Sequence, residues 1–456
     1  YKLIVNLSDS DQLFSLSDAI MTKDLDIVVF GASGFTGKFV VEEICRTAQA
    51  IHKFKWAISG RSEQRLLEVA NIISISNNKN VRQPEIIVAD VFNPESLQIL
   101  AKRSKLIIDC VGPFRLYGEP VVIACIENEA DYIDISGEVE YIEQIQLKYH
   151  EPAKSRNITI VPACGYDSVP ADMGLLFTKQ QLDARSAIPS QIEIFSGLHS
   201  GSAGIRGNYG TYASIVYSVS SVHNLRELRR HANLPKVPRI GTNLKILPSG
   251  KFDKRINGYI IPSFTTDPSI MRLGQQLDIV FNTGIPPAQI SSYLVFSRFK
   301  YIAMMILGGS VFKLLARYEW GKNLLLKYPN GPTLEQIQQC GFYHRFYAKG
   351  ISTKRLNTEE MDLISSPEQR KGSSILHNLQ PDVEIVTEIK GPEAGYVTTP
   401  ITVVQCAYTL LKEKEKIPKG VCTPSIAFGK TSLFQRLNEN GIEFNVLEGH
   451  FDIQQE

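Results

Sequence analysis

The sequence lacks the residue patterns that mark disulfide-rich or metal-binding proteins. Its seven cysteines form no Cys-x-x-Cys pair, and their odd number does not suit a disulfide framework, so we interpret them as free thiols in a reducing compartment. Its eight histidines have neither the HxxxH nor the HExxH spacing of zinc sites. The sequence therefore predicts an intracellular protein without a metal site.

Long runs of one charge and a secretory leader are also missing. The 49 Lys and Arg residues against 47 Asp and Glu give a net charge of +2, and no basic stripe appears, which excludes a dedicated nucleic-acid binder. The first residues meet acids at Asp9, Asp11 and Asp18, unlike a signal peptide. We expect residues 1–23 to be an extension outside the fold. A small molecule or a lipid remains as the partner.

The chain of 456 residues is long enough for two or three domains. Residues 24–164 alternate apolar runs with amphipathic stretches, which predicts a parallel α/β sheet of the Rossmann type. The apolar runs are residues 27–30, 56–58, 86–88 and 106–108, and the expected helices are 37–49, 62–73 and 94–103.

After about residue 160 the pattern changes to glycine-rich turns and longer strands. Residues 165–390 are expected to form a second, mixed α+β domain, within which the polar stretch 350–381 indicates a flexible loop. Strand-like alternation resumes at Val383, and a helix is expected from about 400 to 414. Residues 391–456 would then form a C-terminal return segment.

A glycine-rich turn follows the first apolar run. Gly31 permits the tight turn, Gly34 admits a pyrophosphate close to the backbone, and Gly37 lets the following helix pack on the strand. A ligand-free glycine turn is the alternative, but the strand before it and the helix after it favour a nucleotide site. The residues expected to contact the cofactor here are Gly31, Ser33, Gly34, Phe35, Thr36 and Gly37.

The second strand ends in Ser59, Gly60 and Arg61, where an NAD site would place an acid. The guanidinium of Arg61, with Arg65 as a further candidate, suits a 2′-phosphate, so we favour NADP over NAD. The alternative is that Arg61 only caps a helix surface. Asp90 ends the third strand and is expected to contact adenine or its ribose, unless it caps the helix near residue 94.

Cys110, Val111 and Gly112 end the fourth strand and are expected to pass under the nicotinamide ribose. We interpret Cys110 as a buried small residue and not as a nucleophile, because no histidine lies near it in the sequence.

These motifs together resemble the saccharopine dehydrogenase-like oxidoreductase family, which is related to saccharopine reductases and trans-acting enoyl reductases. The resemblance covers roughly residues 24–448. It implies a Rossmann domain, a mixed α+β domain, and C-terminal segments that pack back against the first domain. The segments that carry it are the glycine turn, Ser59 to Arg61, Cys110 to Pro120, Tyr132 to Glu138, Gly391 to Tyr396, Thr423 to Phe428 and Asn440 to Phe444.

Three polar residues at expected strand ends are the candidate catalytic residues. Tyr117 follows the nicotinamide strand, Asp134 ends another strand, and Asp167 lies in the expected hinge to the second domain. For each of them turn or cap chemistry is the alternative. Two Tyr-x-x-x-Lys pairs, at Tyr318 and Tyr408, lie far beyond the first domain, so we regard them as coincidental.

Residues 293–317 contain an apolar segment, 301–316, whose uncharged core of 12 residues is too short to span a bilayer. Its basic flanks, Arg298, Lys300, Lys313 and Arg317, fit a segment that lies in a lipid interface. A helix buried in the second domain, or a homodimer contact, is the alternative.

The sequence thus predicts an NADP-dependent oxidoreductase that acts on a lipid-like substrate at a lipid surface. The resemblance implies association with lipid droplets or membranes and a role in lipid or glycolipid metabolism, and it leaves the mitochondrion open as a location. Two alternatives remain, which are a saccharopine reductase of lysine metabolism and a non-catalytic nucleotide-binding protein of lipid droplets.

Overall fold

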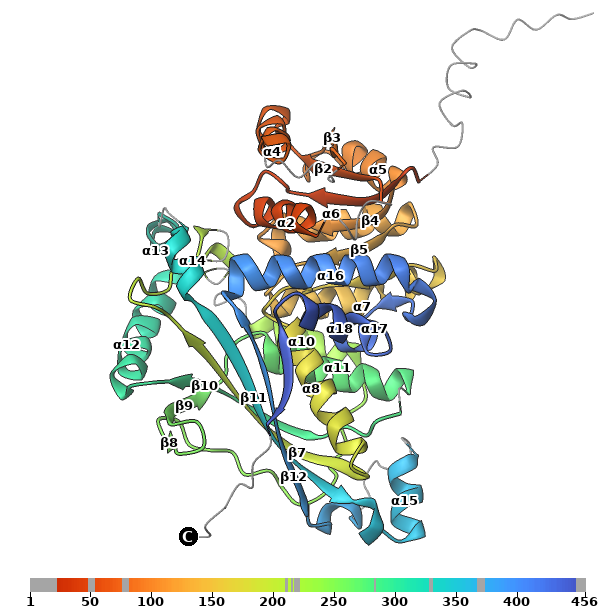
Figure 1. Ribbon diagram of the computed structural model, residues 1–456, viewed down its shortest axis with the longest axis vertical. Helices are drawn as coiled ribbons and strands as arrows, with labels where there is room; N and C mark the ends of the chain where they lie inside the picture. The colour runs from red at the N-terminus through yellow and green to blue at the C-terminus, as the bar shows by residue number, and fades with distance from the viewer. Residues whose placement is uncertain are drawn as a thin grey trace, which may run out of the picture.

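The computed structural model of the chain describes residues 23–47, 54–75, 82–209, 212–214, 216, 222–282, 284–327, 331–366 and 374–447. The expected N-terminal extension therefore lies almost wholly outside the described residues. Figure 1 shows two sheets joined by a layer of helices, with the first sheet at the top of the view and the second below it.

The first sheet has seven parallel strands in the order β13-β6-β5-β4-β1-β2-β3 among the described residues. Six of them follow the Rossmann order 3-2-1-4-5-6, which confirms the predicted fold class. The strands are β1 (Leu25–Phe30), β2 (Trp56–Gly60), β3 (Glu85–Val88), β4 (Ser104–Asp109), β5 (Asp131–Asp134), β6 (Thr159–Val161) and β13 (Gly420–Val421).

Helices cover both faces of this sheet, so its central strands are apolar without alternation. In β1, five of six residues are buried. The helices α2 and α4 contact each other, as do α5, α6 and α7, because right-handed crossovers change face where the strand order reverses. The helices are α2 (Phe35–Arg46), α4 (Glu63–Ile75), α5 (Pro94–Arg103), α6 (Phe114–Glu127) and α7 (Val139–Ser155).

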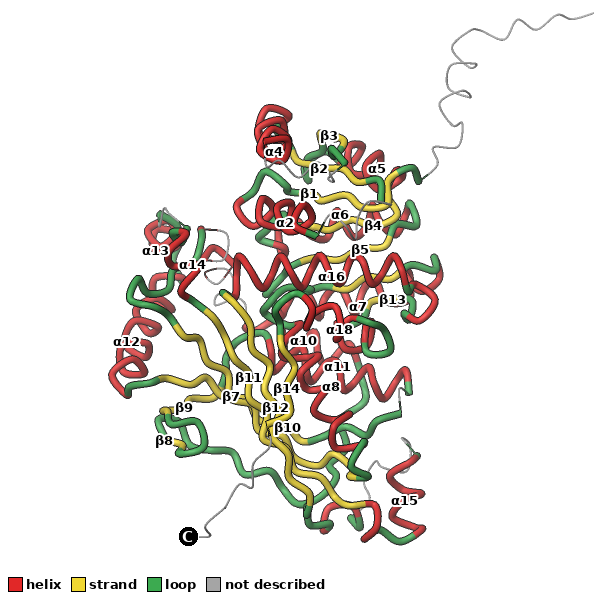
Figure 2. Tube along the Cα trace, in the orientation of Figure 1, coloured by secondary structure: helices red, strands yellow, loops and turns green. Residues whose placement is uncertain are grey.

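The second sheet is mixed, with the order β14-β12-β11-β7-β10-β9-β8. Strands β7 and β10 are parallel, whereas the other described pairs are antiparallel. Figure 2 shows these long strands crossing the lower half of the molecule. They are β7 (Ala187–His199), β8 (Phe252–Asp253), β9 (Gly258–Pro262), β10 (Gln289–Phe296), β11 (Gly341–Ser352), β12 (Val383–Pro392) and β14 (Glu443–Leu447).

Helix α8 packs on one face of the second sheet, and α11 and α17 pack on α8. Three further helices, α12, α13 and α14, lie between β10 and β11 in the described chain. The helices of this region are α8 (Val169–Asp183), α10 (Val222–Ala232), α11 (Asp267–Phe281), α12 (Phe299–Ala316), α13 (Glu319–Leu325), α14 (Leu334–Gln339), α15 (Thr358–Ser365), α17 (Pro424–Phe428) and α18 (Leu433–Glu439).

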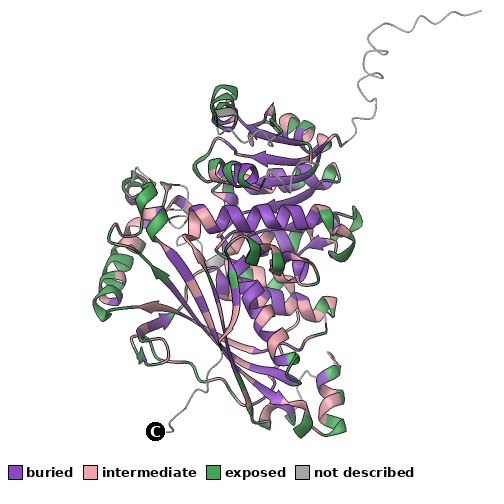
Figure 3. Cartoon of the chain, viewed as in Figure 1, coloured by how far each residue is buried: buried purple, intermediate pink, exposed green. Residues whose placement is uncertain are grey.

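The C-terminal segments return to the first sheet, as the resemblance implies. Strand β13 pairs with β6, and helix α16 (Thr399–Lys412) packs against α2, β4 and β5. Figure 3 shows α16 buried along most of its length. The hydroxyls of Thr47 and Tyr408 lie 3.1 Å apart although 361 residues separate them in the chain.

The described residues of the stretch 350–381, which are 350–366 and 374–381, include regular structure where the polar composition predicts a flexible loop, and 367–373 lie outside the described residues. Strand β11 continues to Ser352, and helix α15 follows a capping box in which Asn357 accepts from the backbone N–H of Glu360 and Glu360 accepts from that of Asn357. A reciprocal cap of this kind stabilises the start of a helix that is otherwise polar.

Candidate active site at the carboxyl edge of the first sheet

The predicted cofactor residues all follow carboxyl ends of parallel strands, and these ends meet at one edge of the first sheet. The glycine turn follows β1, Arg61 follows β2, Asp90 follows β3 and Cys110 follows β4. The structure therefore brings these residues to one edge, as the strand pattern predicts.

The glycine turn is too tight for side chains at two of its positions. Gly31 has a φ of +83°, and a Cβ there would lie 2.7 Å from the Cγ2 of Val111. At Gly37 a Cβ would lie 2.2 Å from the carbonyl oxygen of Gly31. Helix α2 has Gly34 as its N-cap and no side-chain cap. The first N–H groups of α2 thus fit a pyrophosphate.

Ser59 supports this turn from the neighbouring strand. Its carbonyl oxygen accepts hydrogen bonds from the backbone N–H groups of Gly31, at 2.8 Å, and Ala32, at 3.1 Å. Its Oγ is buried and has no hydrogen-bond partner among the described residues. A buried, unpaired hydroxyl beside the glycine turn is consistent with a polar ligand at this edge.

Arg61 is exposed directly after β2, and no described residue forms an ion pair with its guanidinium. Arg65, on the first turn of α4, is exposed as well. Arg61 is thus positioned for a 2′-phosphate without a competing carboxylate.

Asp90 forms a turn and does not cap the following helix. Its Oδ1 accepts from the backbone N–H of Phe92 at 3.1 Å. The N-cap of α5 is Asn93, whose Oδ1 accepts from the backbone N–H of Ser96. The helix-cap alternative for Asp90 is therefore wrong, and its second carboxylate oxygen stays at the edge of the sheet.

Phe35, which is expected to contact the cofactor, packs its ring against α2 and the C-terminal return segment. The ring contacts Phe39 and Tyr396, with centroid distances of 5.4 and 5.0 Å. Tyr396 belongs to a π-helical turn, η3 (Ala394–Thr398), that precedes α16. The side chain of Phe35 thus joins α2 to the C-terminal return segment.

Cys110 is partly buried, and its backbone N–H donates to the carbonyl of Phe30 at 2.9 Å. Burial raises the pKa of its thiol well above the usual range, and the charge of Asp109 adds to the shift. A thiol with a raised pKa is a poor nucleophile, in agreement with its interpretation as a packing residue.

Asp134 is fully buried, with 0% exposure. Its Oδ1 accepts from the backbone N–H groups of Ser136 and Ala163, and its Oδ2 accepts from the hydroxyls of Tyr132 and Tyr141. With both oxygens occupied, Asp134 holds the ends of β5 and β6 together. This geometry gives it a structural role in place of the catalytic contact that its position predicts.

Glu138 also fills a cap role. Its carboxylate accepts from the backbone N–H groups of Phe114 and Arg115 at the start of α6 and from the hydroxyl of Ser214. A carboxylate at a helix N-terminus stabilises the helix dipole.

Tyr117 lies toward the β3 side of the edge. Its ring packs edge-to-face on Phe92, with centroids 5.7 Å apart, and Phe92 follows β3. Because α5 packs beside α6, the first turn of α6 meets the turn after β3. Strands β5 and β6, which precede Asp134 and Asp167, lie on the opposite side of β4 and β1.

Asp167 is exposed in the loop between β6 and α8, whereas Tyr117 is partly exposed and Asp134 is buried. The protein atoms around it still raise the pKa of its carboxyl above the usual range. A second carboxyl, that of Asp267 at the start of α11, is nearly buried, and its Oδ1 has no partner among the described residues. Burial and then the charge of Asp167 raise the pKa of Asp267 well above its usual range.

Tyr166 completes this group. Its ring packs edge-to-face on Phe342 of β11 at 4.9 Å and stacks on His344 at 5.8 Å. Burial raises the pKa of its phenol well above the usual range, and the charges of Asp267 and Asp167 raise it further. Its hydroxyl therefore remains a hydrogen-bond donor over the physiological pH range.

His344 lies next to Tyr166 on the second sheet with 0% exposure. Its Nδ1 lies 2.7 Å from the Oγ of Ser196, whereas its Nε2 has no partner among the described residues. Burial lowers the pKa of its imidazole to about 3, so the ring is neutral. Tyr166, Asp167, Asp267 and His344 thus form a cluster of titratable side chains between the first sheet and the second, which we call the candidate proton-handling group.

No motif in the sequence marks Tyr166, Asp267 or His344 as site residues. Asp267 follows two threonines and precedes Pro268, a pattern typical of an ordinary helix start. His344 lies on an alternating strand, where a lone histidine is indistinguishable from a core residue. Only the register of β11 with β7, which pairs His344 with Ser196, gives it a polar neighbour.

Comparison with known proteins shows the family to which the chain belongs. The family model of the saccharopine dehydrogenase NADP binding domain matches residues 27–161. A human protein named saccharopine dehydrogenase-like oxidoreductase is 37% identical over 438 residues, which cover 92% of this chain and 97% of the human protein. The chain belongs to the saccharopine dehydrogenase-like oxidoreductase family. It is an oxidoreductase with NADP as its cofactor, and the glycine turn and the unpaired Arg61 fit that cofactor.

Two further members of the family have informative names. A probable mitochondrial saccharopine dehydrogenase-like oxidoreductase of Arabidopsis thaliana is 36% identical, covering 92% of this chain and 96% of that protein. A lipid droplet localized protein of Caenorhabditis elegans is 32% identical, covering 94% of this chain and 99% of that protein.

A solved structure supports the fold of the family. The saccharopine dehydrogenase (L-Glu forming) of Saccharomyces cerevisiae superposes with a TM-score of 0.51, covering 93% of this chain and 100% of that chain. Its sequence identity is 10%, so the likeness concerns the arrangement of the two sheets and not the substrate.

Proposed function

We propose that this oxidoreductase transfers a hydride between NADP and a lipid-like substrate while docked on a lipid surface. NADP supplies the hydride chemistry. The chain's part is to hold the pyrophosphate at the glycine turn, the 2′-phosphate at Arg61 and a ribose at Asp90, with Cys110 to Gly112 under the nicotinamide side.

The proton accompanying the hydride is assigned to the group around Asp167. Asp167 is solvent-accessible, and its carboxyl lies near a phenol and a second carboxyl that both have raised pKa values. A carboxyl whose pKa is shifted toward neutrality is suited to general acid-base catalysis. Tyr166 is positioned to donate a hydrogen bond to the substrate oxygen from the same side.

The observation that supports docking on a lipid surface is the exposure of α12. Among its 18 residues only Ile302 and Ala316 are buried, and Met304, Leu307 and Leu314 are each at least 60% exposed. Figure 3 shows this helix at the left margin as an exposed element. An apolar helix this exposed is typical of an interaction surface.

Helix α12 is long and apolar enough, by length and composition, to cross a membrane. The chain, however, leaves the second sheet through β10 and returns through β11, and both strands pair with β7. One crossing by α12 would put β10 and β11 on opposite sides of the bilayer, which their common pairing with β7 excludes. A helix lying in the interface fits this connection, with Tyr318 and Trp320 stacked at 6.2 Å beside the basic flanks.

Liposome flotation tests the docking. Replacing Leu307, Val311 and Leu314 by Glu should abolish flotation and leave NADPH binding unchanged, because these side chains lie on an exposed face. The control replaces Leu67 and Ile72, exposed apolar residues of α4, by Glu and should float like the parent. Undiminished flotation of the triple variant would reject α12 as the anchor. A parent that does not float but dimerises through α12 would indicate a second copy as the partner.

Consumption of NADPH on fractionated lipid extracts tests the reaction. The proposal expects one lipid fraction to be turned over. Saccharopine, a secondary amine that can only be oxidised, is supplied with NADP⁺ in place of NADPH, and it is expected to form no NADPH. Turnover of saccharopine without turnover of any lipid fraction would assign the protein to amino-acid metabolism instead. The name of the worm relative supports lipid droplets as the first source of extract.

A further inference from the structure

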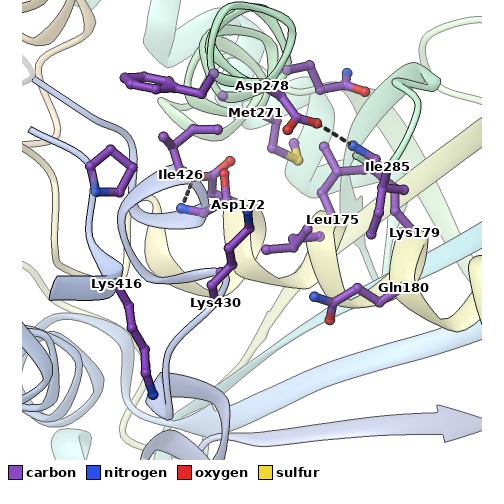
Figure 4. A pocket seen from close by; sticks show the side chains of 17 residues that line it. Asp172, Leu175, Lys179, Gln180, Met271, Asp278, Ile285, Lys416, Ile426 and Lys430 are labelled. Carbon is purple, nitrogen blue, oxygen red and sulfur yellow. Dashed lines mark hydrogen bonds and ion pairs between the residues drawn. The ribbon is translucent and has the colours of Figure 1, made fainter. Parts of the chain in front are cut away.

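A pocket of about 200 Å³ lies apart from the carboxyl edge of the first sheet, between α8, α11 and α17. Figure 4 shows it from close by, with Asp172 near its centre. Its lining contains no residue of the glycine turn and none of the proton-handling group. It is therefore separate from the site assigned to NADP and its reaction partner.

The walls of the pocket are mainly apolar. Leu175 comes from α8, Met271 and Phe281 from α11, and Ile426 from α17. Protein interiors leave few voids larger than a water molecule, and an apolar cavity of about 150 Å³ is enough to bind benzene. By that comparison the pocket accommodates an apolar chain of about eight carbon atoms.

Most charges that line the pocket are already compensated. Lys179 and Asp278 form a buried ion pair of 3.0 Å, and Asp172 accepts from the backbone N–H of Ser425 at 2.8 Å. Lys416 pairs with Glu413 at 2.9 Å. Lys430 is exposed, and no described residue forms an ion pair with it.

The polar groups are divided between two sides of the pocket. In Figure 4, Lys416 and Lys430 lie on one side and the ion pair of Lys179 with Asp278 lies on the other. An ammonium group donates up to three hydrogen bonds, and among the described residues Asp278 is the acceptor for that of Lys179. Two of the lining groups have no ion-pair partner among the described residues. The carboxyl of Asp172 is held inside by its hydrogen bond from Ser425, and the ammonium of Lys430 is exposed beside the apolar walls.

We propose that this pocket is a binding site for a medium-chain carboxylate, with the carboxylate at Lys430 and the alkyl chain among Leu175, Met271 and Phe281. An anion with an apolar tail matches both the positive rim and the apolar walls. Alkyl chains much longer than eight carbons exceed the volume, so the site selects by length.

Methionine-methyl NMR of the full-length protein with NADP bound tests the proposal directly. Met271 lines the pocket, whereas Met304 and Met305 lie on α12, so one spectrum separates the two apolar sites. Octanoate should shift the Met271 signal and leave those of Met304 and Met305 in place. Octanol has the tail without the charge, and acetate has the charge without the tail. Each should bind at least about tenfold more weakly than octanoate.

The octanoate affinity of single-residue variants tests the same proposal independently. Lys430→Met should weaken octanoate about tenfold, as expected for loss of one charge-assisted hydrogen bond, and should abolish the preference for octanoate over octanol. Lys245→Met is the matched control, because Lys245 is exposed in the loop before β8. Leu175→Phe should close the pocket and remove binding, with NADPH fluorescence confirming an intact cofactor site.

Absence of a Met271 shift at millimolar octanoate would overturn the proposal. Equal binding of octanoate and octanol, or shifts confined to Met304 and Met305, would overturn it as well. None of these outcomes bears on docking through α12 or on the NADP reaction, because neither depends on this pocket.

Discussion

The carboxylate of Asp167 lies directly against the Cα of Gly137, where an added Cβ would be 2.5 Å from Oδ2. The carbonyl oxygen of Gly137 also accepts from the hydroxyl of Thr266, at 2.7 Å, one residue before Asp267. Gly137 therefore sets the positions of both carboxyls. Because Gly137 has no side chain, the carboxylate of Asp167 can lie against its Cα.

Gly137→Ala should displace Asp167 and lower NADPH consumption on the substrate at least about tenfold, because misplaced acid-base groups lose much of their effect. The affinity for NADPH, measured by fluorescence titration, should change less than about twofold. A variant with parental turnover would show that the position of Asp167 does not matter to the reaction.

Asp167→Asn and Asp134→Asn should have opposite consequences. The first should reduce kcat/KM by about 10²- to 10⁴-fold with little change in thermal stability, because Asp167 is exposed and makes no buried network. The second should destabilise the fold by about 1 to 3 kcal/mol, because an amide cannot accept from all four donors around Asp134. Differential scanning calorimetry and steady-state kinetics on both variants separate the two roles, and the reverse pattern would contradict the assignment.

Gly37→Ala should weaken NADPH binding at least about tenfold, because the new Cβ would lie 2.2 Å from the carbonyl oxygen of Gly31 and would open the turn. Gly308→Ala on α12 is the matched control, since no atom lies within 4 Å of a Cβ there. The control should keep its affinity and gain up to about 1 kcal/mol of helix stability. An unchanged NADPH affinity in Gly37→Ala would argue against the glycine turn as the pyrophosphate site.

Arg61→Met should weaken the binding of NADPH by about tenfold or more and leave the binding of NADH unchanged. The reason is that a charge-assisted contact to the 2′-phosphate is worth about 1.5 to 3 kcal/mol. Arg65→Met provides the comparison, and its smaller effect would identify Arg61 as the main contact. Equal losses for NADPH and NADH would mean that Arg61 acts on a part common to both nucleotides.

His344 predicts a specific dependence of stability on pH. Burial lowers the pKa of its imidazole from 6.5 to about 3, so below pH 6.5 the unfolded chain binds a proton that the folded chain does not. Stability from this residue is complete above pH 6.5 and is lost as the pH falls toward 3, by about 4 to 5 kcal/mol at most. In His344→Gln the free energy of unfolding should depend less on pH over this range. Urea unfolding at pH 7, 5.5 and 4.5 measures it. The same dependence of the free energy of unfolding on pH in variant and parent would contradict this prediction.

The sequence predicted the first sheet well because its signals are local. The apolar runs before Gly31, Arg61 and Cys110 coincide with β1, β2 and β4. The steric requirement for Gly37 is local as well, because it comes from the carbonyl of Gly31, six residues earlier. The C-terminal return was also anticipated, although only through the family resemblance and not from periodicity.

The proton-handling group was predicted only at Asp167, because its other members acquire their character from distant residues. His344 and Ser196 are 148 residues apart, and Asp267 is unusual only through its burial beside Asp167. The structural role of Asp134 is hidden for a related reason, since its four donors come from β5, the turn after β5, α7 and the turn after β6. Conversely, the start of α15 had a local signal, the Asn357 and Glu360 capping pair, which the polar composition of 350–381 concealed.

The pairing of β13 with β6 has a consequence for biosynthesis. Residues 420 and 421 complete the first sheet, and α16 covers it from positions 399 to 412, so the N-terminal half of the chain leaves the ribosome with an unpaired edge and an uncovered apolar face. Closing that sheet requires contacts across more than 250 residues, a separation that slows folding. The nascent NADP domain therefore keeps an apolar face and a strand edge exposed until translation has reached the last helices.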